Sequence, residues 1–232
     1  MPLQTELSRD LPLESGGEVH VRFTGVTQGD LRIDGPAEEL AVRRERLVAG
    51  SWSWLRQVHG AQVVVVDHPG QHAGVEADAA ITDQPGVVLA IHTADCAPVA
   101  LIGSHGAVGA VHAGWRGLDA GVIEAAFDGL RRLGETEVQA IVGPCIHAEC
   151  YEFGSHELDG LARRYGEDVR GRTTAGTPAL DLPAAVTTAL HRAGVDQVDL
   201  VPTCTACDQA FFSHRARGNP GRQALVVWVD GP

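Results

Sequence analysis

The chain lacks long hydrophobic runs: no segment of its 232 residues approaches the about 20 apolar residues that a helix needs to span a bilayer. Its first residues, MPLQTELSRDLPLE, also lack the apolar core of about 7 to 15 residues that is typical of a secretory signal peptide. We therefore expect a cytoplasmic protein with no membrane partner.

Positive charge is scarce as well. There are 18 Lys+Arg residues against 30 Asp+Glu residues, so the formal net charge is -12. A nucleic-acid-binding surface would have to be local and would work against this background, because phosphate contacts depend on Lys and Arg. We expect no nucleic-acid partner. Hydrophobic residues make up 44% of the chain, which is enough for one large core or two fused halves of a globular protein.

The cysteines do not form a disulfide framework, because there are only 5 of them, an odd number, and their spacing is irregular. Reduced thiols are then expected, available for metal binding or chemistry. Cys204 and Cys207 form a CxxC motif, which is typical of half a zinc knuckle or of a redox pair. A second CxxC motif is absent, which disfavours a four-thiolate zinc site at this pair.

Hydrophobic periodicity predicts helices that alternate with groups of short strands. The helices are expected over residues 37–48, 118–133, 155–165 and 182–193, with Ser155 as an N-cap and Gly166 and Gly194 as stops. The strands are expected over residues 62–67, 79–82, 87–92, 98–102, 107–112, 138–142, 197–201 and 223–229. Several connections between the strands are too short for crossover helices, so antiparallel or mixed pairing follows. The fold class is therefore an α+β sandwich in a single domain.

Polar residues interrupt these apolar strands in four segments. The segments are RQVHG with His59, HTADC with His92, Asp95 and Cys96, VHAGWRG with His112 and Arg116, and FFSHRARGNPGR with Ser213, His214, Arg215 and Arg222. Two histidines and a thiolate form a three-ligand set that suits zinc or copper and leaves a fourth position open. Taken singly, each residue also has an ordinary structural explanation: a satisfied core histidine, a small buried cysteine, a turn aspartate or an arginine stacked on Trp115.

Several strings of the chain resemble the YfiH family, whose members have been described as polyphenol-oxidase laccases and which is related to the human laccase-domain protein. They are RQVHGAQVVVVD, ADAAITDQPGVVLAIHTADCAPVAL, VGAVHAGWRGL, GPCIHAECYEFG and CTACDQAFFSHR, and the match is strongest over residues 52–229. The resemblance implies a single-domain layered α/β/β/α sandwich over residues 1–232, with mixed and antiparallel sheets. It also implies a metal site at His59, Cys96 and His112, which leaves His92 out of the ligand set.

The same resemblance implies a purine nucleoside phosphorylase acting on adenosine, inosine, guanosine or methylthioadenosine, with adenosine deamination as a second activity. We expect Arg116 and either Arg215 or Arg222 to bind phosphate, the co-substrate. Asp95, beside the metal ligand Cys96, is the expected proton shuttle, with Asp78 behind it. Arg22 aligns with an arginine that contributes to the family's substrate pocket, although the LN pair that follows in the family has no clear counterpart here.

Two other activities stay open. Relatives are also described as peptidoglycan editing factors, which implies hydrolysis of a cell-wall precursor with Cys96 as nucleophile and His112 as base. A copper-dependent phenol oxidase is the other alternative, although laccases need several copper centres and only one three-ligand set is visible. The sequence does not choose Zn²⁺ over copper, and it gives no oligomeric state.

Overall fold

The computed structural model describes residues 7–13 and 16–230, and its centre consists of two six-stranded β-sheets. Neighbouring strands of the first sheet are, in order, β1 (Ser8–Pro12), β2 (Glu18–Phe23), β14 (Gln223–Val229), β7 (Val88–Thr93), β3 (Trp52–Arg56) and β5 (Val75–Glu76). Those of the second are β13 (Gln197–Leu200), β10 (Val138–Val142), β8 (Ala97–Gly103), β9 (Val108–Ala113), β6 (Ala79–Thr82) and β4 (Val63–Val65). Strand pairing in both sheets is mixed, as the short connections predict.

The two sheets pack face to face and bury a shared apolar core. Side chains of the first sheet, such as Leu89, Ile91 and Leu225, contact Ile102 and Val108 of the second. Strands β7, β8 and β9 are buried along their whole length, which explains why they form nearly continuous apolar runs in the sequence. A polar side chain at the end of such a strand is therefore held by a rigid support.

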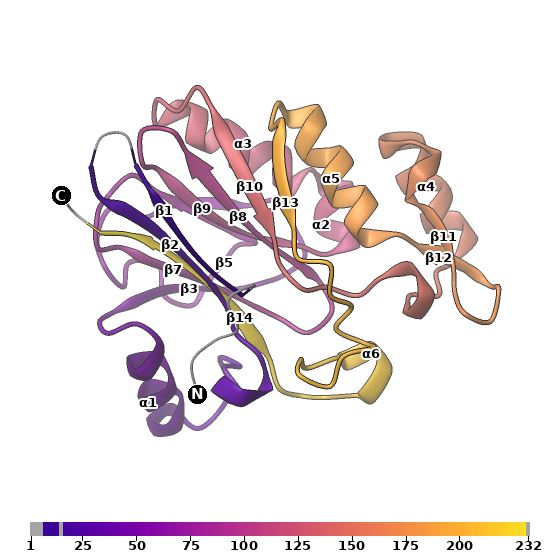
Figure 1. Ribbon diagram of the computed structural model, residues 1–232, viewed down its shortest axis with the longest axis horizontal. Helices are drawn as coiled ribbons and strands as arrows, with labels where there is room; N and C mark the ends of the chain where they lie inside the picture. Colours follow the sequence, from indigo (N-terminus) through magenta and orange to yellow (C-terminus); the bar gives the residue numbers. More distant parts are fainter. Residues whose placement is uncertain (1–6, 14–15, 231–232) are drawn as a thin grey trace.

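Helices cover the outer face of each sheet, which confirms the layered α/β/β/α architecture (Figure 1). Helix α1 (Ala37–Leu47) packs Leu40 against the first sheet. Helices α2 (Trp115–Ala120), α3 (Val122–Arg132) and α5 (Leu182–Ala193) lie on the other side of the molecule, over the second sheet. Helix α4 (Ser155–Tyr165) packs against α5 and α2 at the side of this layer. The remaining elements are the short helix α6 (His214–Arg217), the hairpin of β11 (Arg170–Arg172) and β12 (Pro178–Leu180), and three 3-10 helices, η2 (Val26–Gln28), η3 (Ala148–Cys150) and η4 (Glu167–Val169). Within residues 7–13 and 16–230, no helix has the length and apolar character needed to cross a membrane.

Several predicted boundaries need correction. The single helix expected over residues 118–133 is two helices, because Gly121 adopts the left-handed conformation (φ 88°) and separates α2 from α3. Gly154, not Ser155, is the N-cap of α4, and Ser155 is the first helical residue. The prediction missed β3 and the β11–β12 hairpin, and α1 ends at Leu47. The predicted ends of α4 at Gly166 and of α5 at Gly194 are confirmed.

Candidate active site and metal centre

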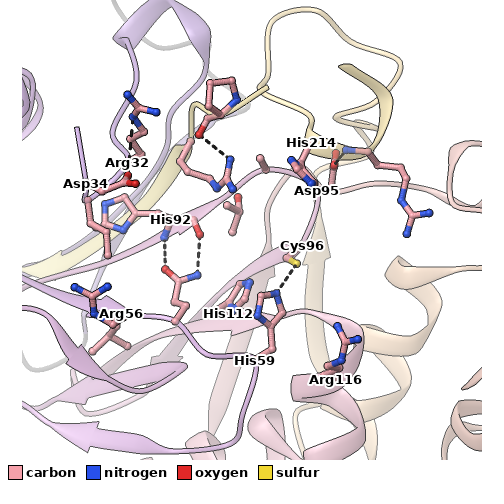
Figure 2. A pocket seen from close by; sticks show the side chains of 18 of the residues that line it. Arg32, Asp34, Arg56, His59, His92, Asp95, Cys96, His112, Arg116 and His214 are labelled. Carbon is pink, nitrogen blue, oxygen red and sulfur yellow. Dashed lines mark hydrogen bonds and ion pairs between the residues drawn. The ribbon is translucent and has the colours of Figure 1, made fainter. Parts of the chain in front are cut away.

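A cleft of about 840 Å³ opens where several loops meet at the ends of the strands. Its walls come from the loop after β3, the turn between β7 and β8, the end of β9 with the start of α2, and the segment from α6 to β14. Figure 2 shows His59, Cys96 and His112 grouped at one part of this cleft, with Arg116 beside them and His92, Arg32 and Arg56 further away. The segments RQVHG, HTADC and VHAGWRG thus supply this group and Arg116. The fourth predicted segment, FFSHRARGNPGR, lines the same cleft.

His59, Cys96 and His112, hereafter the cleft triad, have the arrangement of a metal-ligand set. Their candidate ligand atoms all lie within 4.8 Å of one another, and Cys96 Sγ is 3.9 Å from His59 Nε2. The imidazole rings meet edge to face at 4.8 Å between centroids. Two imidazoles and a thiolate are a donor set that binds zinc or copper and leaves a coordination position toward the cleft. The residues present therefore fit the metal that the sequence analysis expects.

Asp78 holds two members of the cleft triad in place from behind. Its carboxylate accepts a hydrogen bond from His112 Nδ1 at 2.8 Å, so that Nε2 of the same ring faces the other ligands. It also accepts the backbone N–H groups of Val58, His59 and Gly60 at 3.2, 2.9 and 2.7 Å. A carboxylate behind a ligating histidine fixes the tautomer and orients the ring. The expectation that Asp78 stands behind Asp95 is wrong, because these bonds place it behind His112 and His59.

The charges of the triad are strongly coupled. Burial alone would raise the pKa of Cys96, but the positive charge of His112 outweighs it and lowers the pKa to about 6. Burial would likewise lower the pKa of His112, but the Cys96 thiolate and the Asp78 carboxylate raise it to about 9. Asp78 follows the same logic: burial opposes ionisation, and the hydrogen bonds from His112 and the N–H of Gly60 nevertheless lower its pKa. Without metal, the triad is thus a thiolate–imidazolium pair at neutral pH.

Asp95 occupies the tight turn between β7 and β8 with a left-handed backbone (φ 98°) and lines the cleft beside Cys96. Its carboxylate accepts the Thr205 hydroxyl at 2.8 Å and the backbone N–H of Arg215 at 2.7 Å. Its carbonyl oxygen accepts the N–H of Ile146. Asp95 therefore ties the turn that carries Cys96 to two segments distant in the sequence.

Gly114, within the HAGWRG motif, leaves room for the triad. A Cβ atom at this position would lie 3.0 Å from Cys96 Sγ and 3.0 Å from Cδ2 of His59. Any side chain would push the two ligands away, so the glycine permits the end of β9 to approach them closely. The glycine of the HAGWRG motif is thus needed for steric reasons, whereas its histidine is a candidate metal ligand.

The predicted phosphate-binding arginines are not equivalent. Arg116 is exposed in the cleft and stacks on Trp115 at 4.3 Å, and Arg215 lies over the Tyr151 ring at 5.0 Å. Both guanidinium groups are held by aromatic rings rather than by carboxylates. Arg222 also lines the cleft, but its Nη1 donates to three main-chain carbonyls between residues 219 and 221. Arg116 and Arg215 are therefore better placed than Arg222 to bind an anion.

The expectation that Arg22 contributes to the substrate pocket needs correction, because Arg22 is not among the residues that line the cleft. It lies on β2, where its guanidinium forms an ion pair with Asp10 at 2.6 Å and packs over Trp228. The structure instead places Arg32 and Arg56 in the cleft wall. The sequence analysis missed both, since Arg32 lies in an irregular polar loop and Arg56 ends a strand that was not predicted.

His92 lies in the wall of the cleft but does not belong to the triad. It is 6% exposed, and neither of its ring nitrogens has a hydrogen-bond partner among the described residues. Burial, helped by the positive charges of Arg44 and Arg222, lowers its pKa to about 3, so the ring is neutral. The neighbouring Thr93 hydroxyl is also buried without a partner. Buried polar atoms without a partner are unusual, and these lie on two residues that line the cleft.

The fold and this site define the class of protein. A family model described as multi-copper polyphenol oxidoreductase laccase matches residues 25–230, and the chain belongs to this family. Two solved structures share the fold. YlmD from Geobacillus stearothermophilus has a TM-score of 0.79 and 27% identity, with 93% of each chain covered. A Neisseria meningitidis protein has a TM-score of 0.79 and 30% identity, with 97% of this chain and 99% of the other covered.

Curated relatives carry a more particular name, purine nucleoside phosphorylase. One from Mycobacterium tuberculosis is 33% identical over 237 residues, which cover 98% of this chain and 94% of the relative. One from Streptomyces coelicolor is 38% identical over 198 residues, covering 84% and 79%. One from Xylella fastidiosa is 40% identical over 186 residues, covering 76% and 71%. The family model's match over residues 25–230 includes all three residues of the cleft triad.

Proposed function

We propose that this chain is a metal-dependent purine nucleoside phosphorylase that acts on adenosine, inosine, guanosine or methylthioadenosine. The observation that carries the proposal is the cleft triad with Arg116 and Arg215 in one cleft. The names of the curated relatives point the same way. Five arginines line this cleft although the chain as a whole carries a formal charge of -12, which favours an anionic ligand at this place.

Phosphate binding is assigned to Arg116 and Arg215. In phosphorolysis a phosphate oxygen forms a bond to C1′ of the ribose while the bond from C1′ to the purine nitrogen breaks, and the electron pair of that bond leaves with the purine. Charge-assisted hydrogen bonds from two guanidinium groups hold the phosphate and place its negative charge beside the positive charge that develops on the ribose. Trp115 and Tyr151 keep the two guanidinium groups in position.

The triad is assigned the metal. When bound there, a zinc or copper ion supplies a Lewis acid beside the cleft. Asp78 orients His112 and the loop of His59 through its four hydrogen bonds, which preorganises the ligands. Gly114 lets the third ligand, Cys96, approach without obstruction.

The nucleoside is assigned to the part of the cleft around His92. The neutral His92 ring can donate one hydrogen bond and accept another, and the Thr93 hydroxyl can do the same. Both are buried and lack partners among residues 7–13 and 16–230, so a purine nucleoside would satisfy them. Leu55 and Ile33 supply apolar surface in the same wall.

Adenosine deamination is proposed as a second activity in the same cleft. It requires a group that moves a proton, and Asp95 is the carboxylate that we assign to this task. The Thr205 hydroxyl and the N–H of Arg215 each donate to one oxygen of the Asp95 carboxylate, which leaves a lone pair on each oxygen for a proton. Thr205→Val removes the first of these bonds and should change deamination more than phosphorolysis.

The test is product analysis with adenosine and zinc-loaded protein, with and without phosphate. Adenine and ribose 1-phosphate that form only with phosphate support phosphorolysis. Inosine that forms without phosphate supports deamination. If no purine nucleoside is converted in either condition, the proposal fails.

A second candidate function rests on the lowered pKa of Cys96. A thiolate beside a protonated His112 is also the arrangement of a cysteine hydrolase, such as a peptidoglycan-precursor editing enzyme. That enzyme would form an acyl-enzyme on Cys96, which intact-protein mass spectrometry detects. A metal ligand at Cys96 instead predicts that Cys96→Ser loses the metal and that no acyl-enzyme forms. A copper-dependent phenol oxidase would need several copper ions in the cleft, where the triad offers one ligand set.

A further inference from the structure

A second group of thiols lies outside the cleft. Cys204 and Cys207, the CxxC pair, are joined in space by Cys150 and Glu149 from a distant part of the chain. We call these four residues the cysteine cluster. Their candidate ligand atoms lie within 4.8 Å of one another, although 57 residues separate Cys150 from Cys207. None of the three cysteines lines the cleft.

The distances within the cysteine cluster bracket those of a tetrahedral thiolate site. Sulfur atoms bound to one zinc ion at about 2.3 Å lie about 3.8 Å apart. Here Cys150 Sγ is 3.3 Å from Cys207 Sγ, and Cys207 Sγ is 3.7 Å from Glu149 Oε1. Three sulfurs and a carboxylate oxygen complete four ligands. The fold therefore supplies from Cys150 and Glu149 what the sequence lacks, a second half for the CxxC motif.

Backbone N–H groups around Cys204 point to its sulfur and lower the pKa of the thiol, against a larger upward effect of burial. Cys204 Sγ accepts the N–H of His147 at 3.4 Å, and the N–H groups of Ala206 and Cys207 also point to it. Hydrogen bonds of this kind to a sulfur are the usual surroundings of a metal-bound thiolate. Arg217 adds a positive charge to the same loop, where it donates to the carbonyls of Thr205, Ala206 and Phe211 at 2.8, 2.8 and 2.7 Å.

The surroundings of the cysteine cluster indicate a structural rather than a catalytic site. A smaller cavity of about 220 Å³ touches Glu149 and His147 but none of the three cysteines. This cavity therefore does not reach the three sulfurs, and four protein ligands leave no coordination position free. The cysteine cluster joins two segments of the chain, one directly before Tyr151 and one that continues through Thr205 to Arg215. Tyr151 and Arg215 line the cleft, and Thr205 donates a hydrogen bond to Asp95 in its wall.

We propose that Cys150, Cys204 and Cys207, with Glu149 as fourth ligand, bind a zinc-class divalent cation in a closed structural site. The ion replaces the three thiol protons, which pass to solvent, and no bond between sulfurs forms. The site then clamps one wall of the cleft from outside. This inference does not depend on the reaction catalysed in the cleft.

The test counts metal in fully reduced protein titrated with Zn²⁺ and then with Co²⁺. We expect about two zinc ions for each unmodified chain and about one in the double variant Cys150→Ser/Cys207→Ser. Cobalt thiolate charge-transfer absorbance should fall by about three quarters in that variant, because it loses the site with three of the four thiolates. Cys145→Ala is the matched control: it removes a buried cysteine outside the ligand set and should keep both ions.

The single variant Cys207→Ser guards against misfolding, since Cys207 is exposed. Its affinity for the second zinc ion should fall at least about 100-fold while the first ion stays bound. Zinc should also raise the unfolding midpoint of the unmodified chain by at least about 5 °C more than that of this variant. Equal zinc content in the unmodified chain and the double variant would overturn the proposal, whatever the cleft binds. The readouts are metal content and unfolding, so a failure here is separate from any failure of the phosphorylase proposal.

Discussion

The cleft triad and the cysteine cluster both use thiols, yet they differ in ligand type, support and exposure. The triad combines one sulfur with two imidazoles, faces a cleft of about 840 Å³ and has a carboxylate, Asp78, behind it. The cluster combines three sulfurs with one carboxylate and has no such cleft at its sulfurs. An open three-ligand set suits catalysis, and a closed four-ligand set suits structure. The neighbouring residues of a cysteine thus decide which of the two roles its thiol suits.

The two sites also differ in how they charge their thiols. Burial would raise the pKa of Cys96, but His112 lowers it to about 6. Burial also raises the pKa of Cys150 and Cys204, and hydrogen bonds that act in the opposite direction do not reverse that shift. The hydrogen bond with Cys150 raises the pKa of Cys207. The triad is therefore charged before metal arrives, whereas the cluster needs the metal to become charged.

Removal of a triad ligand should have the largest effect. We expect His112→Ala to lose the cleft metal and to lower kcat/KM for phosphorolysis at least about 1,000-fold, because a Lewis acid contributes several kcal/mol to the transition state. Steady-state kinetics with metal analysis checks this. His105→Ala, which alters an exposed histidine paired with Glu135, is the control and should keep both metal and activity. Full activity in metal-free His112→Ala would break the comparison between the sites.

Removal of a cleft arginine should have the next largest effect. Arg116→Ala should raise KM for phosphate by about 10-fold to 100-fold, since a charge-assisted hydrogen bond contributes about 1.5 to 3 kcal/mol. The matched control is Arg22→Ala, because Arg22 lies outside the cleft and pairs with Asp10. Initial rates at varied phosphate concentration measure both. An equal rise in the two variants would contradict the assignment of Arg116.

Loss of the Asp78 charge behind the triad should lower the zinc affinity of the cleft but not that of the cysteine cluster. Asp78→Asn keeps the shape of the side chain but removes its charge, and we expect the affinity of the cleft for zinc to fall about 10-fold to 100-fold. The affinity of the cysteine cluster for zinc should stay unchanged, since the carboxylate of Asp78 accepts hydrogen bonds from His112 and from residues 58–60. Competition with a zinc chelator separates the two constants. Parallel loss at both sites would show a general effect on folding instead.

Thiol reactivity in metal-free, reduced protein should give the smallest effect. Because the pKa of Cys96 is lowered to about 6 and those of the other four cysteines are raised, Cys96 should react with iodoacetamide roughly 10-fold faster at pH 7.5. Its rate should fall as the pH drops through about 6, where the thiolate takes up a proton. Peptide mapping identifies the labelled cysteine. Faster labelling of Cys150 or Cys207 would reverse the predicted order.

Much of the fold could be predicted from the sequence because its strands and helices have clear periodicity. Strands β6, β10 and β14 and helices α4 and α5 have the predicted bounds. The break at Gly121 was missed because the apolar positions continue across it, and only the backbone conformation reveals two helices. Strand β3 was missed as well, although it is as long as the predicted strand β10.

The residues of the site also fall into two groups, those that the sequence could identify and those that needed the fold. His59, Cys96 and His112 come from motifs that each stand at a strand end or in the adjoining loop, so a resemblance in sequence suffices to group them. Asp78 and Arg22 were misplaced because side-chain partners depend on packing that spacing does not reveal. The link from Cys150 to Cys207 needed the fold as well, since nothing in the local sequence connects the two segments.

The central claim is that catalysis belongs to the cleft triad and stability to the cysteine cluster. The most direct test measures phosphorolysis in two zinc-loaded variants that each keep one of the two sites, His112→Ala and Cys150→Ser/Cys207→Ser, well below their unfolding temperatures. We predict that the first retains zinc at the cluster and has almost no activity, and that the second retains zinc in the cleft and has the kcat of the unmodified chain. Activity in the first and none in the second would contradict the account.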